Sequence, residues 1–297
     1  MKISVIVPSY NQAKYLSATL DSLERQRYPD LEVRVYDGGS KDGSVEVLRS
    51  HKAGFWWRSQ RDRGQSDAIN QGLMEASGDI LAFLNSDDVY YDHTLRRVAD
   101  HFSRNPDCQV LYGDAHHLNA DGSFMENYYT EAWDYSRLQE VCFLCQPAVF
   151  WRREIVERFG VLDEKLHYAL DYEYWLRIGK HIPFHHMKGT FLAGSRLHAD
   201  TKTLGQRSKV HNEILDVVIR HGGSEKAVQT WLGHLAYYEA CESENPHATN
   251  PEARARWVTR FVACMLHEAG RKGIRLKLEK LAELEAHLAA VGKPPCV

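Results

Sequence analysis

The first hundred residues alternate between short apolar runs and segments in which apolar residues recur at helical spacing. Each apolar run is rich in β-branched or aromatic residues and has the length of a buried strand. The predicted strands cover residues 3–7, 31–36, 55–57 and 80–84. Leu16, Leu20 and Leu23 show helical spacing in the segment after the first strand, and Asn11 is expected to cap that helix. Strands that alternate with helices predict an α/β fold with a mainly parallel, open sheet flanked by helices.

The pattern changes near residue 203. A last strand is expected at 190–193, and the helical segments that follow are 206–221, 224–243, 252–268 and 274–291. The charge changes at the same place: residues 1–200 hold 23 basic and 29 acidic residues, whereas residues 201–297 hold 14 and 11. We therefore expect a catalytic α/β domain at 1–203 and an all-helical C-terminal region at 204–297.

Composition excludes several classes of protein. The 297 residues carry a formal charge of −3, so the basic excess typical of a nucleic-acid-binding protein is missing. No run approaches the roughly 20 consecutive apolar residues of a membrane span. The N-terminal apolar run stops at Pro8 without a small-residue cleavage site, and six cysteines are too few for a disulfide framework. We expect a cytoplasmic globular protein with no nucleic-acid partner.

Polar residues follow the ends of three predicted strands, at residues 9–11, at Asp37 and at residues 85–88. In open parallel sheets, the ligand crevice lies outside these carboxyl ends. The turn after the first strand lacks the glycines of a dinucleotide-binding unit, and the chain has no P-loop. Carboxylates without a glycine-rich loop can hold a diphosphate through Mg²⁺ or Mn²⁺.

Five segments occur in an order typical of one family. They are SVIVPSYN at 4–11, DGGS at 37–40 with DG at 42–43, SDAINQG at 66–72, LNSDD at 84–88 and DYEYWLR at 171–177. In this order they resemble glycosyltransferase family 2, and the last looks like the family's E-D-Y-x-x-W-L-R helix. The resemblance implies a type A nucleotide-sugar-binding fold, inversion at the anomeric carbon and a divalent cation, Mn²⁺ or Mg²⁺, at an Asp-x-Asp motif.

The resemblance also implies roles for individual residues. The expected nucleotide-sugar-binding residues are Pro8, Ser9, Tyr10, Asn11, Asp37, Asp67, Asn85, Ser86 and Asp88. Asp87 is the expected metal ligand, His198 of the Arg-x-His segment is the second candidate, and Asp171 matches the catalytic base. Several of these assignments have structural alternatives. Asp37 and Asp87 can be turn formers or helix caps, and Asp171 can be a helix-start residue favoured by the macrodipole. Asp67 can cap a helix, and His198 can lie in a solvated loop.

Three positions depart from the family pattern. Gly38 stands where a second Asp is frequent, Asn85 replaces the first Asp of the metal motif, and Leu170 replaces the Glu before the base. They leave open a non-catalytic nucleotide-sugar-binding or scaffold protein with a degenerate site. A sugar-phosphate nucleotidylyltransferase is disfavoured, because its glycine-rich first loop with Arg and Lys is missing.

The predicted function is inverting, metal-dependent transfer of a hexosyl or N-acetylhexosaminyl group from a nucleotide-diphospho-sugar, with uridine expected from family frequency. The expected acceptor is the hydroxyl of a glycan or lipid-linked saccharide in bacterial-type surface polysaccharide synthesis. Residues 271–280 carry five basic side chains against Glu279, so the segment 271–291 is a candidate for peripheral contact with the inner face of a membrane. Packing on its own domain, or on a second copy in a homo-oligomer, is the other interpretation.

The remaining cysteine and histidine pairs predict no metal site. The C-x-x-C spacing of Cys142 and Cys145 has no second pair to complete a zinc site, so both are expected in the core. The pairs at 116–117 and 185–186 are poor candidates, because adjacent residues on a strand point to opposite faces.

Overall fold

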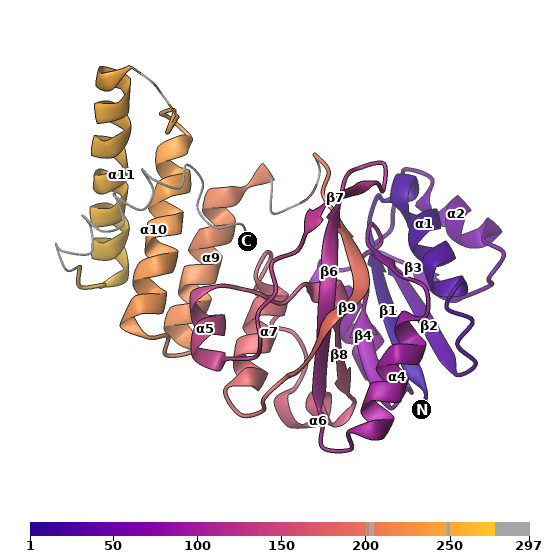
Figure 1. The fold of residues 1–297 in the computed structure, drawn as a ribbon. Helices are drawn as coiled ribbons and strands as arrows, with labels where there is room; N and C mark the ends of the chain where they lie inside the picture. Colours follow the sequence, from indigo (N-terminus) through magenta and orange to yellow (C-terminus); the bar gives the residue numbers. More distant parts are fainter. Residues whose placement is uncertain (200, 202–204, 248–249, 277–297) are drawn as a thin grey trace. The chain divides into compact units, whose positions relative to one another are not determined.

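The computed structural model describes residues 1–199, 201, 205–247 and 250–276. They form two compact units, one made of Met1–Tyr135 with Phe143–His198, and one made of Ser136–Cys142 with the described residues from Ala199 onward. The first unit contains the sheet, and the second is helical (Figure 1).

The first unit is built on a nine-stranded open sheet in the order β3-β2-β1-β4-β8-β6-β9-β5, with β7 paired to β6. The strands are β1 Ile3–Ser9, β2 Leu31–Asp37, β3 Trp56–Ser59, β4 Ile80–Phe83, β5 Val89–Tyr90, β6 Val110–Leu118, β7 Phe124–Asn127, β8 Val149–Arg152 and β9 His185–Arg196. The four strands β3, β2, β1 and β4 are parallel, as predicted. Strand β8 runs antiparallel between β4 and β6, and β6 pairs in parallel with β9. The predicted α/β architecture is confirmed, and the strand expected at 190–193 is part of the longer β9.

Eight helical segments connect these strands. They are α1 Ala13–Glu24, α2 Ser44–Ser50, α3 Gln65–Glu75, α4 Thr94–Arg104, α5 Tyr135–Glu140, the 3₁₀ turn Gln146–Ala148, α6 Glu154–Phe159 and α7 Leu170–Gly179. Alternation along β1 assigns them to faces: Val5 and Val7 join a core with leucines of α1, α2 and α4, whereas Ile6 lies under α3. A Cβ at Gly72 of α3 would lie 2.4 Å from Ile6 Cγ2, so glycine lets α3 approach the sheet closely.

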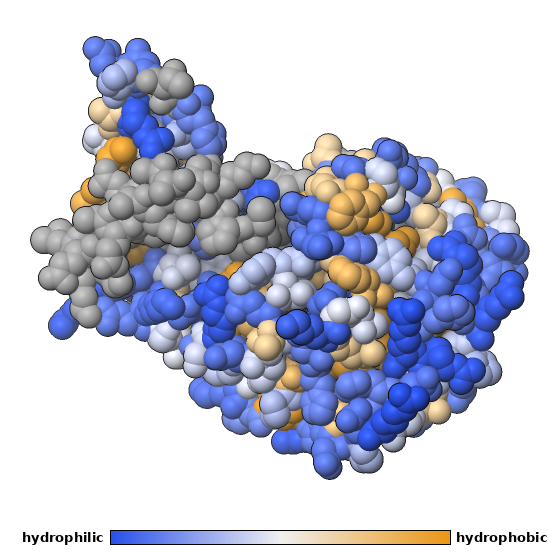
Figure 2. Space-filling view, viewed as in Figure 1, coloured by the Kyte–Doolittle hydropathy of each residue, from blue (hydrophilic) through white to orange (hydrophobic). Residues whose placement is uncertain are grey.

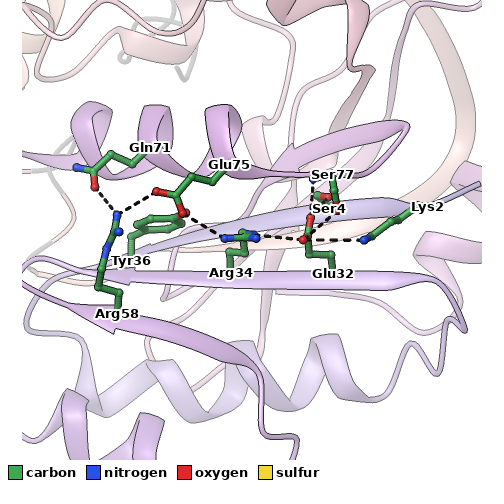
Figure 3. A network of polar contacts seen from close by, with 9 residues as sticks. All are labelled: Lys2, Ser4, Glu32, Arg34, Tyr36, Arg58, Gln71, Glu75 and Ser77. Atoms are coloured by element: carbon green, nitrogen blue, oxygen red, sulfur yellow. Dashed lines mark hydrogen bonds and ion pairs between the residues drawn. The ribbon is translucent and has the colours of Figure 1, made fainter.

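A polar network crosses β2 on the face covered by α3 (Figure 3). Glu32 accepts hydrogen bonds from Ser4 Oγ at 2.5 Å, Ser77 N at 2.8 Å and Arg34 Nε at 3.2 Å. Arg34 continues to Glu75 of α3, with Nη1 3.2 Å from Oε2. Burial alone raises the pKa of Glu32, but these hydrogen bonds outweigh it and bring the pKa to about 2. The network therefore joins the parallel strands to α3 through charged groups that are paired.

The second unit contains most of α5 and the helices α9 Arg207–Arg220, α10 Glu225–Cys241 and α11 Pro251–Lys272. Helix α10 packs against both α9 and α11. Their predicted positions at 206–221, 224–243 and 252–268 are confirmed. Ser224 caps α10 by accepting from Ala227 N, and Asn250 caps α11 by accepting from Glu252 N. Of the predicted segment 274–291, residues 277–291 lie outside the described part of the chain.

Within the described residues, no helix combines the length and apolar character needed to cross a membrane. On the face shown in Figure 2, hydrophilic residues predominate and apolar residues form small groups among them.

Candidate active site

The loops after β1 and β2 are hydrogen-bonded to each other at the carboxyl end of the sheet. Pro8 and Ser9 are buried at the end of β1, whereas Tyr10 is 62% exposed. Asn11 has a left-handed φ of 52°; its amide N donates to Ser40 Oγ at 2.7 Å, and its Oδ1 accepts from Lys41 N at 2.9 Å. The predicted nucleoside residues thus surround one turn, and Tyr10 offers an exposed ring at its rim.

Asn11 does not cap α1, which corrects the expectation from the sequence. The first turn of α1 is held instead from the loop after β2, where Asp42 Oδ2 accepts from Ala13 N at 2.9 Å and Ser44 Oγ accepts from Gln12 N at 3.1 Å. The cap comes from residues about thirty positions away, so local pattern could not identify it.

Asp37 is 2% exposed, and its own loop occupies both of its carboxylate oxygens. Oδ2 accepts from Gly39 N, Ser40 N and Ser59 Oγ at 3.1, 3.0 and 2.6 Å, and Oδ1 accepts from Ser40 Oγ at 2.5 Å. In this arrangement Asp37 shapes the loop that connects β2 to α2 and ties that loop to Ser59 at the end of β3.

A different carboxylate lies beside Gly38, the position where the family often has a second Asp. A Cβ built on Gly38 would lie 2.8 Å from Asp62 Oδ2, so Asp62 occupies the space that a side chain at 38 would enter. Asp62 Oδ1 accepts from Gly64 N at 2.9 Å. Burial, followed by the charges of Asp67 and Asp37, raises the pKa of Asp62. No motif indicated Asp62, and the one local signal was the Asp-x-Gly turn at 62–64, before α3.

Asp67 is buried in the first turn of α3 and is engaged by Arg63. Its Oδ2 accepts from Arg63 N at 3.0 Å, and its Oδ1 accepts from Arg63 Nη2 at 2.7 Å. The side-chain bond from Arg63 is the main reason that the pKa of Asp67 falls to about 2. These contacts join the first turn of α3 to Arg63, whereas the N-cap of the helix is Gly64, which has no side-chain cap.

Asn85 and Asp88 organise the turn after β4. Asn85 Oδ1 accepts from Gln65 Nε2 at 2.8 Å, and its Nδ2 donates to Gln146 Oε1 at 3.2 Å and Asp88 Oδ2 at 3.3 Å. Asp88 is 3% exposed, as is Ser86, and its Oδ1 accepts from Arg196 N at 2.9 Å. Burial and then the charge of Asp87 raise the pKa of Asp88 well above its usual range, although the Arg196 bond opposes this. The amide at position 85 therefore links three segments, and Asp88 ties the turn to the end of β9.

Asp87 and His198, 111 positions apart, are brought into contact at this end of the sheet. Asp87 Oδ2 lies 3.0 Å from His198 Nε2, and their side chains are 17% and 3% exposed. Tyr15 of α1 packs on the imidazole with ring centroids 4.5 Å apart. Arg196 Nε donates to the backbone oxygen of Asp87 at 2.8 Å. The Arg-x-His segment thus contacts both the backbone and the side chain of Asp87. Tyr15 was not predicted, because it reads as an ordinary apolar helix position.

The Asp87–His198 pair fits a divalent cation. Two ligands at about 2.1 Å in adjacent octahedral positions are about 3 Å apart, and the observed separation is 3.0 Å. A carboxylate oxygen with an imidazole nitrogen suits Mn²⁺ in particular, because imidazole is a borderline ligand. Two protein ligands leave the other positions to water and phosphate oxygens, as is common where a metal binds together with a phosphate substrate.

Asp171 lies in the first turn of α7, where the helix dipole favours an ionised carboxylate. Its Oδ1 accepts from Tyr172 N at 2.8 Å. The segment before α7 is bound to α3: Asn70 Nδ2 donates to Leu162 O, and Leu162 N donates to Asn70 Oδ1, both at 2.9 Å. Arg63 also pairs with Glu164 at 2.9 Å. The helix that carries Asp171 is thus anchored to the helix that carries Asp67.

Comparison with known proteins identifies the family to which the chain is similar. A family model described as "Glycosyl transferase family 2" matches residues 4–160. An uncharacterized glycosyltransferase of Nostoc sp. is 32% identical over 179 residues, which cover 55% of this chain and 54% of the Nostoc protein. A PGL/p-HBAD biosynthesis glycosyltransferase of Mycobacterium tuberculosis is 31% identical over 179 residues, covering 59% of this chain and 68% of that protein. The chain thus spans about half the length of the first of these relatives.

Two solved structures share the fold. TarS 1–349 of S. aureus, in complex with UDP-GlcNAc, has a TM-score of 0.62 at 17% identity and covers 89% of this chain and 82% of its own. The mannosyltransferase PcManGT of Pyrobaculum calidifontis, in complex with GDP-Man and Mn²⁺, has a TM-score of 0.59 at 18% identity, with 98% and 88% covered. At these identities the likeness establishes the fold of the chain only.

Proposed function

We propose, because this chain belongs to glycosyl transferase family 2, that it transfers a sugar from a nucleoside-diphosphate-sugar to a saccharide hydroxyl with inversion at the anomeric carbon. The family membership and the type A fold that the five motifs predict are confirmed. The observation that carries the proposed activity is the contact between Asp87 and His198 at the carboxyl end of β4.

Inverting transfer is a single displacement. The acceptor oxygen attacks the anomeric carbon while the bond to the diphosphate oxygen breaks on the opposite face, and a base takes the hydroxyl proton. We assign that base to Asp171. Its place in the first turn of α7 favours the ionised form that a base needs, and the bonds between Asn70 and Leu162 hold the start of α7 in place.

The leaving diphosphate needs compensation for the negative charge that develops on it. A divalent cation held by Asp87 and His198 would neutralise this negative charge when bound. Tyr15 packs against His198, and Arg196 binds the Asp87 backbone, so both ligands are oriented by contacts that do not depend on the cation. Asn85, with one charge fewer than the usual Asp, orients Asp88 through its amide.

For the nucleotide, we assign the base end to the loops after β1 and β2. Tyr10 supplies an exposed ring, and Asp62 supplies a carboxylate beside Gly38 that can accept from a ring N–H of uracil or guanine. The neighbours support both nucleotides, since the TarS complex holds UDP-GlcNAc and the PcManGT complex holds GDP-Man. We keep the uridine nucleotide as the proposed donor.

The acceptor remains a glycan or lipid-linked saccharide in this proposal, supported by the naming of the mycobacterial relative for PGL/p-HBAD biosynthesis. We place donor binding and chemistry in residues 1–203 and assign acceptor access or assembly to the helices of 204–297.

Transfer is tested with the full chain, a panel of UDP- and GDP-sugars, and Mn²⁺, Mg²⁺ or EDTA. We expect nucleoside diphosphate release that depends on a divalent cation. Asp171→Asn should retain donor binding and lose transfer by about 10²-fold or more. Glu154→Gln is the matched control, because Glu154 is an exposed carboxylate in the first turn of α6. Equal rates for the wild type and Asp171→Asn would refute the base assignment.

The alternative is a nucleotide-sugar-binding protein without activity, which the amide at Asn85 favours because its hydrogen bonds lie within the protein. The same panel distinguishes the two. Donor binding without transfer and without slow donor hydrolysis, under every cation, would favour the alternative.

A further inference from the structure

A second group of metal-ligating side chains lies at the other end of β9 from His198. His101 is in the last turn of α4, Cys108 is in the turn that leads into β6, and His185 is the first residue of β9 (Figure 1). The ligand atoms of these three residues all lie within 4.8 Å of one another, and His101 Nε2 is 3.5 Å from His185 Nδ1. Cys108 is fully buried, and both histidines are half-buried.

We propose that His101, Cys108 and His185 form a binding site for a tetrahedral transition-metal ion of the Zn²⁺ type, separate from the candidate active site. Zinc–nitrogen bonds of about 2.0–2.1 Å place two tetrahedral nitrogens about 3.4 Å apart, close to the 3.5 Å between the two imidazoles. Two imidazoles and a thiolate are ligands that zinc prefers, and water completes the fourth position.

The hydrogen bond between the two histidines is long, and their ring nitrogens face each other. A nitrogen–nitrogen separation of 3.5 Å exceeds the usual 2.7–3.2 Å of a strong hydrogen bond, so it stabilises the fold little. The rings meet edge to face, at 85° with centroids 5.6 Å apart. Two nitrogens that face each other beside a buried sulfur are arranged as ligands of one ion.

The surrounding backbone positions the thiol before any ion binds. Asn105 donates to His101 O through its N at 3.0 Å and its Nδ2 at 2.8 Å, and Cys108 N donates to Asn105 O at 3.0 Å. Arg152 Nε donates to Cys108 O at 2.7 Å. The turn from α4 to β6 is therefore held by hydrogen bonds on both sides of Cys108.

Metal binding releases the thiol proton of Cys108. The Cys108 thiol, which donates to Val110 O at 3.5 Å, loses its proton to solvent as the sulfur–metal bond forms, and neutral imidazoles donate lone pairs. Because the ligands come from α4, the following turn and β9, the ion would cross-link segments that are 84 positions apart. Its expected effect is to stabilise the packing of α4 and the start of β9.

The test uses the metal-stripped full chain and Co²⁺, which reports a thiolate ligand through a sulfur-to-metal charge-transfer band and a tetrahedral site through strong visible absorption. We expect both for the wild type, and competition by Zn²⁺ should remove them. Cys108→Ser should lose the charge-transfer band. Cys145→Ser is the matched control, since Cys145 is also a buried thiol, and it should keep the band.

Two further variants separate this site from the others. Asp87→Asn should keep the charge-transfer band, because it alters only the candidate active site, whereas His185→Ala should weaken Co²⁺ binding even if Cys108→Ser does not fold. Zn²⁺ should raise the Tm of the wild type and of Asp87→Asn, and not that of His185→Ala. A wild type without the band, or a band that survives in Cys108→Ser, would overturn the proposal.

Discussion

Replacing Glu32 by Gln tests whether the polar network under α3 stabilises the sheet through charge. The pKa of Glu32 falls from 4.5 to about 2, because hydrogen bonds from Ser4, Ser77 and Arg34 outweigh the cost of burial. A pKa lowered to about 2 corresponds to roughly 3 kcal/mol of stabilisation of the ionised carboxylate, at about 1.4 kcal/mol for each tenfold change in proton affinity. The side chain is 16% exposed, so solvent screening lowers the expected loss of unfolding free energy to about 2–3 kcal/mol.

The sign of the pH dependence follows from the lowered pKa. The stabilisation is complete well above pH 4.5 and is lost as the pH falls through about 2. The difference between the wild type and Glu32→Gln should therefore shrink to about half at a pH of about 3. In the variant, the acid-side slope contributed by this carboxylate should be absent.

Urea unfolding followed by tryptophan fluorescence at neutral and acidic pH measures both effects. Glu75→Gln is the matched control, because Glu75 belongs to the same network but its side chain is 40% exposed. It should cost about 0–1 kcal/mol. Equal losses for the two variants, or a loss in Glu32→Gln that does not change with pH, would refute the reasoning.

Three further substitutions test the packing and the site. Gly72→Ala should lower the unfolding free energy by about 1–3 kcal/mol in urea, because its Cβ would clash with Ile6, whereas Gly270→Ala, with open space around it, should cost nothing. Asn70→Ala should lower the Tm and the transfer rate together by removing two buried hydrogen bonds worth about 1–3 kcal/mol, and an unchanged Tm would contradict this. Asp62→Asn should weaken UDP binding about tenfold in calorimetry while leaving Mn²⁺ affinity unchanged; equal UDP affinity would exclude Asp62 from the nucleotide site.

Much of the fold follows from local pattern. The parallel strands β1 and β4 are runs such as Ile3–Val7 in which both faces are buried, and such largely apolar runs are what two covering layers of helices require. Strand β2 instead alternates apolar residues with Glu32 and Arg34. The position of β8 could not be predicted in the same way. Its residues 149–151 are also apolar, but whether an apolar strand pairs parallel or antiparallel is decided by the neighbours that it meets.

In the candidate site, too, some features follow from local pattern and others only from the tertiary structure. The motifs placed Asp87, Asp171 and the β1 and β2 loops, because strand ends and helix starts are visible as changes in pattern. The motifs did not indicate that Asp67 would be paired to Arg63 or that a carboxylate would lie beside Gly38. Both outcomes depend on which side chains the loop before α3 brings back to β2.

The sequence by itself thus determined the family, the alternation of strands and helices and the segments at which polar chemistry gathers, because these are properties of neighbours along the chain. The tertiary structure decided the pairs, because sheet register brings together atoms that no local pattern relates. His198 meets Asp87 across 111 positions at one end of β9. His185 meets His101 across 84 positions at the other end. The Arg-x-His motif drew attention to His198, but no local pattern predicted either contact, because each depends on how the fold brings β9 to α4 and to the turn after β4.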